Sequence, residues 1–388
     1  MYKGLDYLQL AALLSDEEKM IMGNTRKWVD QRIIPEIGDY FQKAEFPVHL
    51  VKEMGELGLL GMTIPETYGG AGASYTEYGI AMQELERGDS AIRSFTSVQS
   101  SLVMYPIFMW GSDRQKEYWL PRLARGEKIG AFGLTEANAG SDPARMITRA
   151  KEKGDKIILN GGKMWITNGT IADVSIVWAK DDSQEIRAFL VEKGTPGFTA
   201  PEIKNKLSLR AGNTAALVLN DCEIPGENEL PDAAGLRHAL MCLTNARFGI
   251  AWGAIGAAMA CYDEALNYAK ERIQFDKPIA GFQISQEKLV YMLTEITKMQ
   301  FVTLQVSRLM DKGEGRFTHV SLVKRNNVFH ALEIARIARD LLGANGITTD
   351  YGAIRHMTNL ESVKTYEGTH DIHTLILGKD ITGLSAFH

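Results

Sequence analysis

The sequence has few cysteines, no long hydrophobic run and no strong excess of either charge. Only three cysteines, Cys222, Cys242 and Cys261, occur in 388 residues. Because none of them forms a C-x-x-C pair, they indicate neither a disulfide framework nor a zinc site. A reducing compartment is therefore the expected environment, and each thiol is expected to be a small buried apolar side chain.

No run of about 18 uncharged apolar residues is present, so the sequence predicts no membrane-spanning helix. The formal net charge of -5 and the isoelectric point near 6.0 predict neither nucleic-acid binding nor membrane-surface binding. The first residues resemble neither a signal peptide nor a transit peptide. The expected location is the cytoplasm if the chain is bacterial, or the mitochondrial matrix if it is a processed eukaryotic chain.

The composition, 45% hydrophobic and 23% charged, is that of a globular protein of two or three domains. Residues 1–128 show the helical period, with a capping box at Ser15 and Glu18. Residues 129–236 hold short strand-like runs, with a predicted hairpin turn at Asn160-Gly161, and favour a β-barrel or sandwich. Residues 237–388 return to long apolar-striped helices typical of a bundle, predicted over 237–272, 286–310 and 320–342. Gly343 is expected to end the last of these.

The stretch TYEGTHDIH, residues 365–373, places Glu367 just before a last helix that Thr369 or Asp371 can cap. A carboxylate in apolar surroundings has a raised pKa and can act as a base. The alternative is a solvated loop glutamate, which is the usual situation for this residue type.

Four further stretches suggest ligand contacts. Residues 132–142 (FGLTEANAGSD) and 164–169 (MWITNG) offer donors and an aromatic ring to a flat polar ligand, although a linking loop and a core tryptophan are the alternatives. The first lacks the G-x-G-x-x-G pattern, so it does not favour a Rossmann site. Residues 272–283 (RIQFDKPIAGFQ) offer an arginine for phosphate, and 339–346 (RDLLGANG) permits close backbone approach. Helix termini explain both of these equally well.

Arg93 and Ser94 end the segment ELERGDSAIRS. A guanidinium presents a planar fork of donors, which suits a substrate carboxylate. The alternative is an ion pair between Arg93 and Glu84 or Glu86.

Taken together, FGLTEANAGSD, WITN, NARFGIAWG, RIQFDKPI with Gln283, and TYEGTHDIH resemble the acyl-CoA dehydrogenase family, in order over nearly the whole chain. Within the family the chain is most similar to the glutaryl-CoA dehydrogenases, also through SVQSSLVM and MLTEIT. The resemblance implies an α+β fold with an N-terminal α-helical domain (1–128), a middle β-barrel domain (129–236) and a C-terminal four-helix bundle (237–388). It also implies non-covalent FAD, no metal, a homotetramer, and electron-transferring flavoprotein as acceptor.

The resemblance also implies a role for individual residues. Glu367 is the expected catalytic base. The expected substrate-binding residues are Glu86, Arg93, Ser94, Ser141, Asn245, Arg247, Tyr366 and Gly368. The expected FAD-binding residues are Phe132, Leu134, Thr135, Ser141, Trp165, Ile166, Thr167, Thr369 and Asp371. In a neighbouring subunit, Arg272, Phe275, Gln283, Asp340, Leu341, Gly343 and Ala344 are expected to complete the FAD site. Ala344, in place of a second glycine, and Gly88, smaller than expected, depart from the pattern.

The implied reaction is α,β-dehydrogenation of glutaryl-CoA, with Glu367 abstracting the α proton and hydride passing to flavin N5. The backbone N–H of Glu367 and the flavin ribityl 2′-hydroxyl would stabilise the thioester oxygen. Glutaconyl-CoA would then lose CO2 to give crotonyl-CoA, a step of lysine and tryptophan degradation. A dicarboxylic acyl group is favoured because a fatty acyl chain would leave a buried Arg93 unpaired. The alternatives are release of glutaconyl-CoA, a short- or branched-chain acyl-CoA substrate, an oxidase, and a non-catalytic flavin-binding protein.

Overall fold

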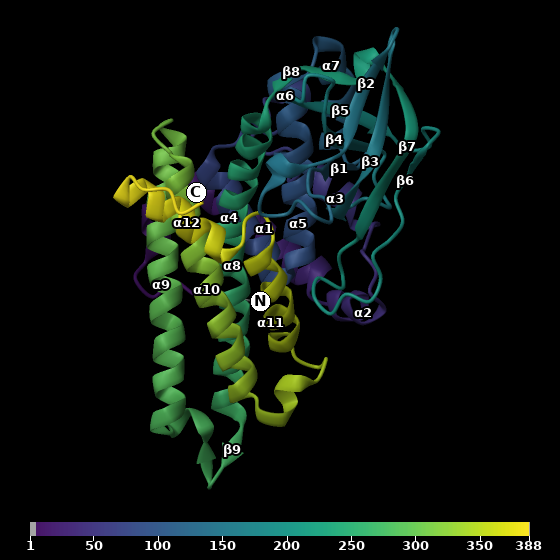
Figure 1. Ribbon diagram of the computed structural model, residues 1–388. Helices are drawn as coiled ribbons and strands as arrows, with labels where there is room; N and C mark the ends of the chain where they lie inside the picture. The colour runs from purple at the N-terminus through teal and green to yellow at the C-terminus, as the bar shows by residue number, and fades with distance from the viewer. Residues whose placement is uncertain (1–4, 388) are drawn as a thin grey trace.

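A computed structural model describes residues 5–387, and these follow the predicted order of helices, then strands, then helices (Figure 1). The N-terminal helices are α1 (Asp16–Trp28), α2 (Ile37–Lys43), α3 (Leu50–Glu56), α4 (Tyr75–Gly88), α5 (Ser90–Ser97), α6 (Tyr105–Trp110) and α7 (Asp113–Ala124). Two π-helical segments, Val29–Ile33 and Val98–Met104, lie among them. The Ser15 hydroxyl accepts the N–H of Glu18 at 3.1 Å, and the Glu18 carboxylate accepts the N–H of Ser15 at 2.9 Å, which confirms the capping box.

The middle strands are β1 (Gly130–Gly133), β2 (Arg149–Lys153), β3 (Lys156–Thr167), β4 (Val174–Lys180), β5 (Ile186–Glu192), β6 (Phe198–Thr199), β7 (Thr214–Pro225) and β8 (Glu229–Ala234). They form one mixed sheet in the order β6-β7-β3-β2-β4-β5-β8, with β1 parallel to β4. Within residues 5–387 the end strands β6 and β8 do not pair with each other. Along the chain these strands lie between the two helical parts, as the sequence predicts.

The hairpin predicted at Asn160-Gly161 is wrong. Both residues lie inside β3, at a register shift opposite β7. The chain reverses instead between β2 and β3, at Gly154 and Asp155. A Cβ at Gly161 would lie 2.7 Å from the Cα of Thr148, so this glycine permits a bulge at a close backbone approach rather than a turn.

The C-terminal helices are α8 (Leu236–Glu271), α9 (Gln283–Asp311), α10 (Phe317–Leu341), α11 (Ala353–Thr365) and α12 (His370–Thr382), with a small hairpin of β9 (Ile273–Gln274) and β10 (Lys277–Pro278) after α8. Helices α8 to α11 lie alongside one another (Figure 1). The predicted bounds of the three long helices are confirmed to within three residues. Gly343, with φ 61°, follows α10 in the left-handed conformation that ends helices.

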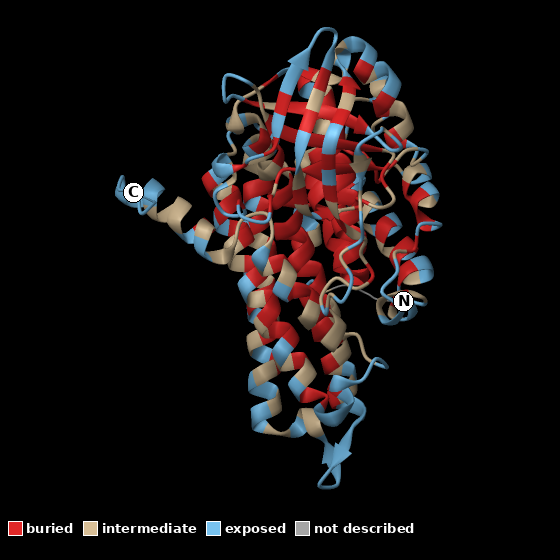
Figure 2. Cartoon of the chain, turned by 45° about the vertical axis from the view of Figure 1, so that its right-hand side comes forward, coloured by how far each residue is buried: buried red, intermediate tan, exposed pale blue. Residues whose placement is uncertain are grey.

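Buried residues concentrate where the three parts of the chain meet, and the end of the bundle that carries β9 is exposed (Figure 2). Helix α8 crosses α4 closely at Gly256, where a Cβ would lie 1.8 Å from the carbonyl oxygen of Gln83. Only glycine fits at this crossing. All three cysteines are buried, as expected. Burial raises the pKa of Cys222 to about 11, and it also raises the pKa of Cys242 and of Cys261.

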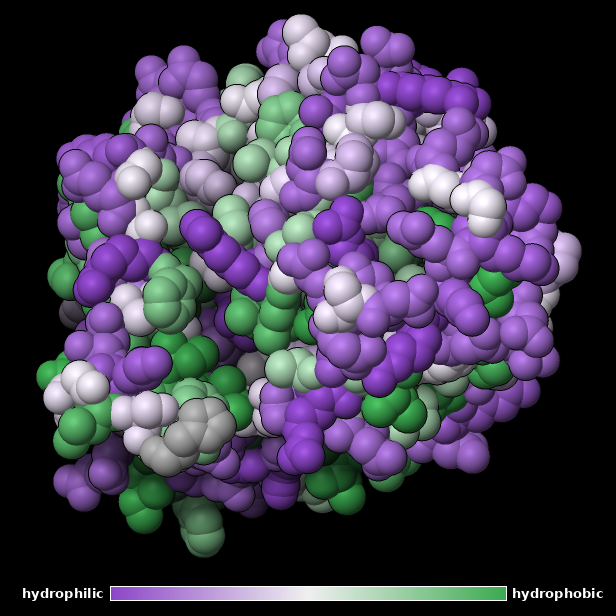
Figure 3. All heavy atoms as spheres, turned by 45° about the horizontal axis from the view of Figure 1, so that its top comes forward, coloured by the Kyte–Doolittle hydropathy of each residue, from purple (hydrophilic) through white to green (hydrophobic). Residues whose placement is uncertain are grey.

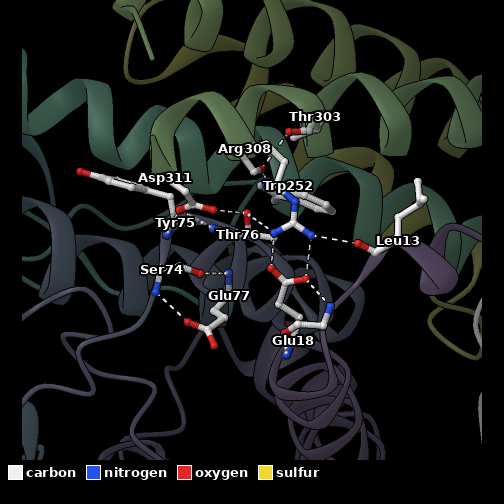
Figure 4. Close-up of polar contacts among 12 residues, drawn as sticks. Leu13, Glu18, Ser74, Tyr75, Thr76, Glu77, Trp252, Thr303, Arg308 and Asp311 are labelled. Atoms are coloured by element: carbon white, nitrogen blue, oxygen red, sulfur yellow. Dashed lines mark hydrogen bonds and ion pairs between the residues drawn. The ribbon is translucent and has the colours of Figure 1, made fainter. Parts of the chain in front are cut away.

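A polar network attaches the N-terminal helices to the bundle (Figure 4). Arg308 of α9 forms an ion pair with Glu18 of α1, with Nη2 donating to Oε2 at 2.8 Å. Asp311, one turn further on, accepts the N–H of Tyr75 at 2.7 Å and the hydroxyl of Thr76 at 2.5 Å. Asp311 therefore caps the start of α4, the helix that carries Glu86 toward the site described below.

The face shown in Figure 3 is largely hydrophilic. On the face shown in Figure 3, hydrophilic residues cover most of the outline and apolar residues gather in the hollowed central part. Large apolar side chains are also exposed near the bundle end, among them Phe275, Ile284 and Val290. Within residues 5–387 no helix has the length and apolar character needed to cross a membrane.

Candidate active site

Glu367 lies in a tight turn between α11 and α12. Its φ is 52° and that of Gly368 is 92°, so both residues adopt the left-handed conformation, which is uncommon for glutamate. Thr369 caps α12, its hydroxyl accepting the N–H of Ile372 at 3.1 Å, which confirms one of the two predicted caps. The sequence therefore folds here into a turn that presents a carboxylate beside a helix N-terminus.

The Glu367 carboxylate is enclosed. Its Oε2 is buried and has no hydrogen-bond partner among the described residues. Burial raises the pKa of Glu367, and the nearby charges of Arg93, Arg247 and Lys324 lower it. An enclosed carboxylate with an unused oxygen can accept a proton from a bound molecule, so the structure contradicts the solvated-loop alternative.

Buried cations hold the backbone of this turn. Arg247 donates from Nε to the carbonyl of Glu367 at 2.6 Å. Lys324 of α10 donates to the carbonyl of Tyr366 at 3.1 Å and to that of Gly368 at 2.8 Å. Three consecutive carbonyls thus accept hydrogen bonds from buried cationic side chains.

Arg93 of α5 is fully buried, and it lies near enough to Glu367 for its charge to lower the pKa of that carboxyl. Its Nε donates to Glu86 Oε2 at 2.5 Å, and its Nη2 donates to the Tyr366 hydroxyl. Glu86 also accepts a hydrogen bond from the Ser90 hydroxyl at 2.8 Å, so both oxygens of the Glu86 carboxylate have partners. Arg93 Nη1 is buried without a partner within residues 5–387. The ion-pair interpretation of Arg93 is confirmed, with Glu86 as the partner, and Nη1 is left as a donor for an incoming group.

The expected flavin residues of the middle part lie at the ends of β1 and β3. Phe132, Leu134 and Ile166 are core side chains, so only their backbone can face a ligand. Trp165 has φ 63° and is 59% exposed at the end of β3. Thr167 lines a small cavity together with Ser94, which brings the middle and N-terminal parts together.

A buried ion pair shapes the loop between β1 and β2. Glu136 accepts Lys163 Nζ at 2.8 Å and the N–H groups of Ile147 at 2.7 Å and Thr148 at 3.0 Å. Burial lowers the pKa of Lys163 to about 8. The pair holds both ends of the loop that carries Ser141, which is exposed. Thr135 accepts the N–H of Met164 at 2.8 Å and joins this loop to β3.

A second group of expected FAD residues lies at the far end of the bundle. Arg272 follows α8, whose rise of about 1.5 Å per residue puts it roughly 37 Å along the helix from Arg247. Phe275 is 88% exposed, and Asp340 forms an ion pair with Lys288. This group, with Gln283, Leu341, Gly343 and Ala344, is not brought to Glu367 (Figure 1).

Two expected residues remain at the edge of the site. Asn245 of α8 is half-buried and accepts the Tyr75 hydroxyl at 3.4 Å. Asp371 is exposed in the first turn of α12. Neither touches Glu367 through a hydrogen bond within the described part of the chain.

Comparison with known proteins decides the family. Three family models match: the acyl-CoA dehydrogenase N-terminal domain over residues 15–127, middle domain over 131–222 and C-terminal domain over 233–382. The human mitochondrial short-chain specific acyl-CoA dehydrogenase is 35% identical over 94% of this chain and 90% of its own length. This chain belongs to the acyl-CoA dehydrogenase family.

Two solved structures of glutaryl-CoA dehydrogenase from Mycobacterium smegmatis are similar over 100% of both chains. One has a TM-score of 0.97 at 52% identity. The other, in complex with FADH2, has a TM-score of 0.98 at 48% identity. As an acyl-CoA dehydrogenase, this chain is an oxidoreductase that acts on acyl-CoA and uses FAD.

The residues present fit the cofactor of an acyl-CoA dehydrogenase. The exposed Trp165 at the end of β3 offers a broad apolar surface for a ring system to cover. Thr167 and the loop after β1 supply hydroxyl and backbone donors beside it. These residues would hold the flavin part.

Sequence reasoning missed three residues of the site. Lys324 lies on the apolar face of α10, and a lysine there was the available signal. Gly253 lies inside α8, where a Cβ would be 2.0 Å from Glu86 Oε2, and an isolated helical glycine often has such a packing reason. The Ser97 hydroxyl, one turn beyond Arg93, is buried without a partner in the described part and carried no sequence signal.

The departure at Gly88 has a packing explanation. A Cβ there would lie 2.8 Å from Ile33 and 3.0 Å from Val29 of the preceding π-helical segment. The small residue therefore accommodates that segment. At Ala344 the methyl group lies on an exposed surface.

Proposed function

We propose that this chain is a glutaryl-CoA dehydrogenase that oxidises glutaryl-CoA between Cα and Cβ and then decarboxylates glutaconyl-CoA to crotonyl-CoA and CO2. The observation that carries the proposal is the buried Arg93, whose Nη1 has no partner in the described chain and which lies beside the unpartnered carboxylate of Glu367. The 52% identity to a glutaryl-CoA dehydrogenase supports it.

Glu367 is the proposed base. The thioester carbonyl acidifies the α C–H, and the buried carboxylate removes that proton. FAD, held by Trp165, Thr167 and the loop after β1, would supply the acceptor for the hydride that leaves the β carbon. The backbone N–H of Glu367 donates no hydrogen bond within residues 5–387, so it is available to the thioester oxygen as negative charge develops there.

Arg93 is the proposed partner of the distal carboxylate of the acyl chain. Glu86 and Tyr366 occupy two of its donors and fix the guanidinium plane, which leaves Nη1 for the substrate. A buried charge without a partner is costly, so a dicarboxylic acyl group fits this site better than a fatty acyl chain. Ser94 adds a hydroxyl on the same helix.

Decarboxylation uses the same residues. After oxidation the distal carboxylate leaves as CO2 and its bonding electrons form a dienolate thioester. Protonated Glu367 then returns a proton to carbon and gives crotonyl-CoA. Its raised pKa, caused by burial, favours holding that proton between the two steps.

The remaining features follow from the same proposal. We place domain boundaries at 128/129 and 236/237, in keeping with β1 starting at Gly130 and α8 at Leu236. A homotetramer, with a dimer as its minimum, would bring Arg272, Phe275 and Gln283 to a neighbour's FAD. The exposed apolar residues at the bundle end support such a contact.

Electron-transferring flavoprotein is the proposed electron acceptor. The proposed compartment is the bacterial cytoplasm, or the mitochondrial matrix for a eukaryotic chain. Buried thiols suit either reducing environment.

The test is anaerobic mixing of the FAD-loaded protein with glutaryl-CoA, with flavin absorbance followed over time and products analysed by mass. Bleaching together with crotonyl-CoA and CO2 is the expected result. Bleaching with glutaconyl-CoA as product would keep the oxidation and remove the decarboxylation from the proposal. No bleaching with glutaryl-CoA would overturn it.

A short-chain acyl-CoA dehydrogenase is the second candidate, because a short-chain specific relative is 35% identical over most of the chain. Butyryl-CoA tests it in the same apparatus. Preference for butyryl-CoA would identify Arg93 as a structural ion-pair residue.

A further inference from the structure

Lys324 is a buried lysine in α10, 1% exposed, on the helix face that also buries Val320 and Val328. Within residues 5–387 it forms no ion pair with a carboxylate, and its ammonium donates to two backbone carbonyls instead. Burying an ammonium group costs free energy unless it is well bonded, so the position calls for an explanation beyond packing.

We propose that Lys324 is a positioning residue that fixes the peptide group before Glu367 and the one after Gly368, and so orients both the carboxylate and the backbone N–H of the base. The proposal rests on the proposed function in taking Glu367 as the base, and it does not depend on which acyl-CoA is the substrate.

The geometry of the turn carries the first step. In a trans peptide the C=O and the following N–H point in opposite directions. Lys324 holds the carbonyl of Tyr366 at 3.1 Å, so the N–H of Glu367 points away from the ammonium. The second hydrogen bond, to the carbonyl of Gly368 at 2.8 Å, holds the far side of the turn. Lys324 thus fixes the peptide plane before the base and the plane after Gly368, while Arg247 holds the carbonyl of the peptide between them.

The backbone conformation carries the second step. Glu367 has φ 52°, and a non-glycine residue keeps such a conformation only where the surrounding structure holds it there. Arg247 holds the carbonyl of Glu367 itself at 2.6 Å. Without Lys324, only the hydrogen bond from Arg247 would remain among those to the carbonyls of residues 366–368. The backbone of the turn could then relax toward more common dihedral angles.

Electrostatics carry the third step. The charged or titratable groups around Lys324 are Glu367, Arg247, Arg93, His370 and His373. Burial lowers the pKa of Lys324 to about 7, Glu367 opposes this shift, and the two arginines add to it. The positive charge of Lys324 in turn lowers the pKa of Glu367, against the effect of burial. Loss of Lys324 would therefore raise the pKa of the base further.

Lys206 offers a matched control. It also donates to two loop carbonyls, those of Leu209 at 3.1 Å and Gly212 at 2.8 Å, and burial lowers its pKa to about 8. It has no hydrogen bond to the turn of Glu367 within residues 5–387. Lys206→Met thus removes the same kind of interaction at a different loop.

The experiment compares Lys324→Met, Lys324→Gln, Lys324→Arg and Lys206→Met with the unmodified protein. For Lys324→Met we expect anaerobic flavin reduction about 100-fold slower at unchanged FAD content, as for a misplaced catalytic group. The acid limb of its pH–rate profile moves to higher pH. Amides of residues 366–369 exchange hydrogen faster even without substrate. Lys324→Arg, which keeps charge and donors, recovers part of the rate, and Lys206→Met leaves the acid limb in place.

An unchanged rate, acid limb and amide exchange in Lys324→Met would overturn the proposal. If that variant does not fold, Lys324→Gln, which removes the charge and keeps a short donor, decides on the same criteria. Reduction of the unmodified protein by butyryl-CoA alone would refute the substrate assignment, and Lys324 is then tested with butyryl-CoA. If no acyl-CoA reduces the flavin, the proposed function fails, and amide exchange at 366–369 still decides whether Lys324 holds the turn.

Discussion

The ion pair between Arg93 and Glu86 permits a clean test of substrate choice. Removing Arg93 alone would leave Glu86 buried with only the Ser90 hydroxyl, and breaking a buried pair costs about 3–5 kcal/mol of stability. The double variant Arg93→Met/Glu86→Gln removes both charges together. It is therefore expected to be more stable than Arg93→Met, so its kinetics can be measured on folded protein.

The magnitude follows from one hydrogen bond. Arg93 Nη1 is the buried donor without a partner in the described chain, and a hydrogen bond from it to a carboxylate is worth about 2–3 kcal/mol. At about 1.4 kcal/mol per tenfold, kcat/KM for glutaryl-CoA should fall about 30- to 150-fold in the double variant. Butyryl-CoA has no distal carboxylate, so its kcat/KM should not fall.

The assay measures kcat/KM for both thioesters with an artificial electron acceptor. Glu86→Gln and Arg93→Met complete a double-mutant cycle that separates loss of the substrate contact from disruption of the pair. Equal losses for glutaryl-CoA and butyryl-CoA in the double variant would refute the assignment of Arg93 to the distal carboxylate.

Three further predictions concern the same site. Glu367→Gln should lower kcat about 100- to 10,000-fold. Burial raises the pKa of this carboxyl, so the stability that its protonated form contributes is present below about pH 4.5 and is lost as pH rises through the raised pKa. Unfolding curves of the variant should lack this pH dependence. Gly253→Ala places a Cβ 2.0 Å from Glu86 Oε2, so the preference for glutaryl-CoA over butyryl-CoA should decrease, and an unchanged ratio of kcat/KM would count against the packing argument. Lys163→Met leaves Glu136 buried without its ion-pair partner and should cost about 3–5 kcal/mol, measured by chemical denaturation, with release of FAD on dilution.

The fold was largely predictable because long helices leave a strong periodic pattern. The helix over 236–271 differs by one residue at each end from its prediction, since its length averages out local exceptions. The turn at Asn160-Gly161 failed for the opposite reason. This dipeptide indicates a hairpin only when one strand ends before it and the next begins after it. Here Gly161 lies within one continuous strand, and a glycine is needed there because Thr148 packs closely against it.

The candidate site was predictable where function depends on residue type and hidden where it depends on partners. A carboxylate that can act as a base and a guanidinium that can bind a carboxylate are recognisable from residue type, so Glu367 and Arg93 were identified. Lys324 works through carbonyls about forty positions away in the sequence, and backbone carbonyls have no sequence signature. The sequence also offered an ion pair or a substrate contact for Arg93 as alternatives, whereas a guanidinium has enough donors for both.

The burial of all three cysteines has a practical consequence for this chain. Thiolates are the reactive form, and burial raises the pKa of each thiol. Maleimides and peroxide, including peroxide formed when a reduced flavin meets oxygen, should therefore leave these three thiols of the folded protein unmodified. A single cysteine introduced at an exposed position outside the proposed subunit contact would be the one readily labelled thiol. Fluorescent probes could then report assembly and cofactor binding without first removing native cysteines.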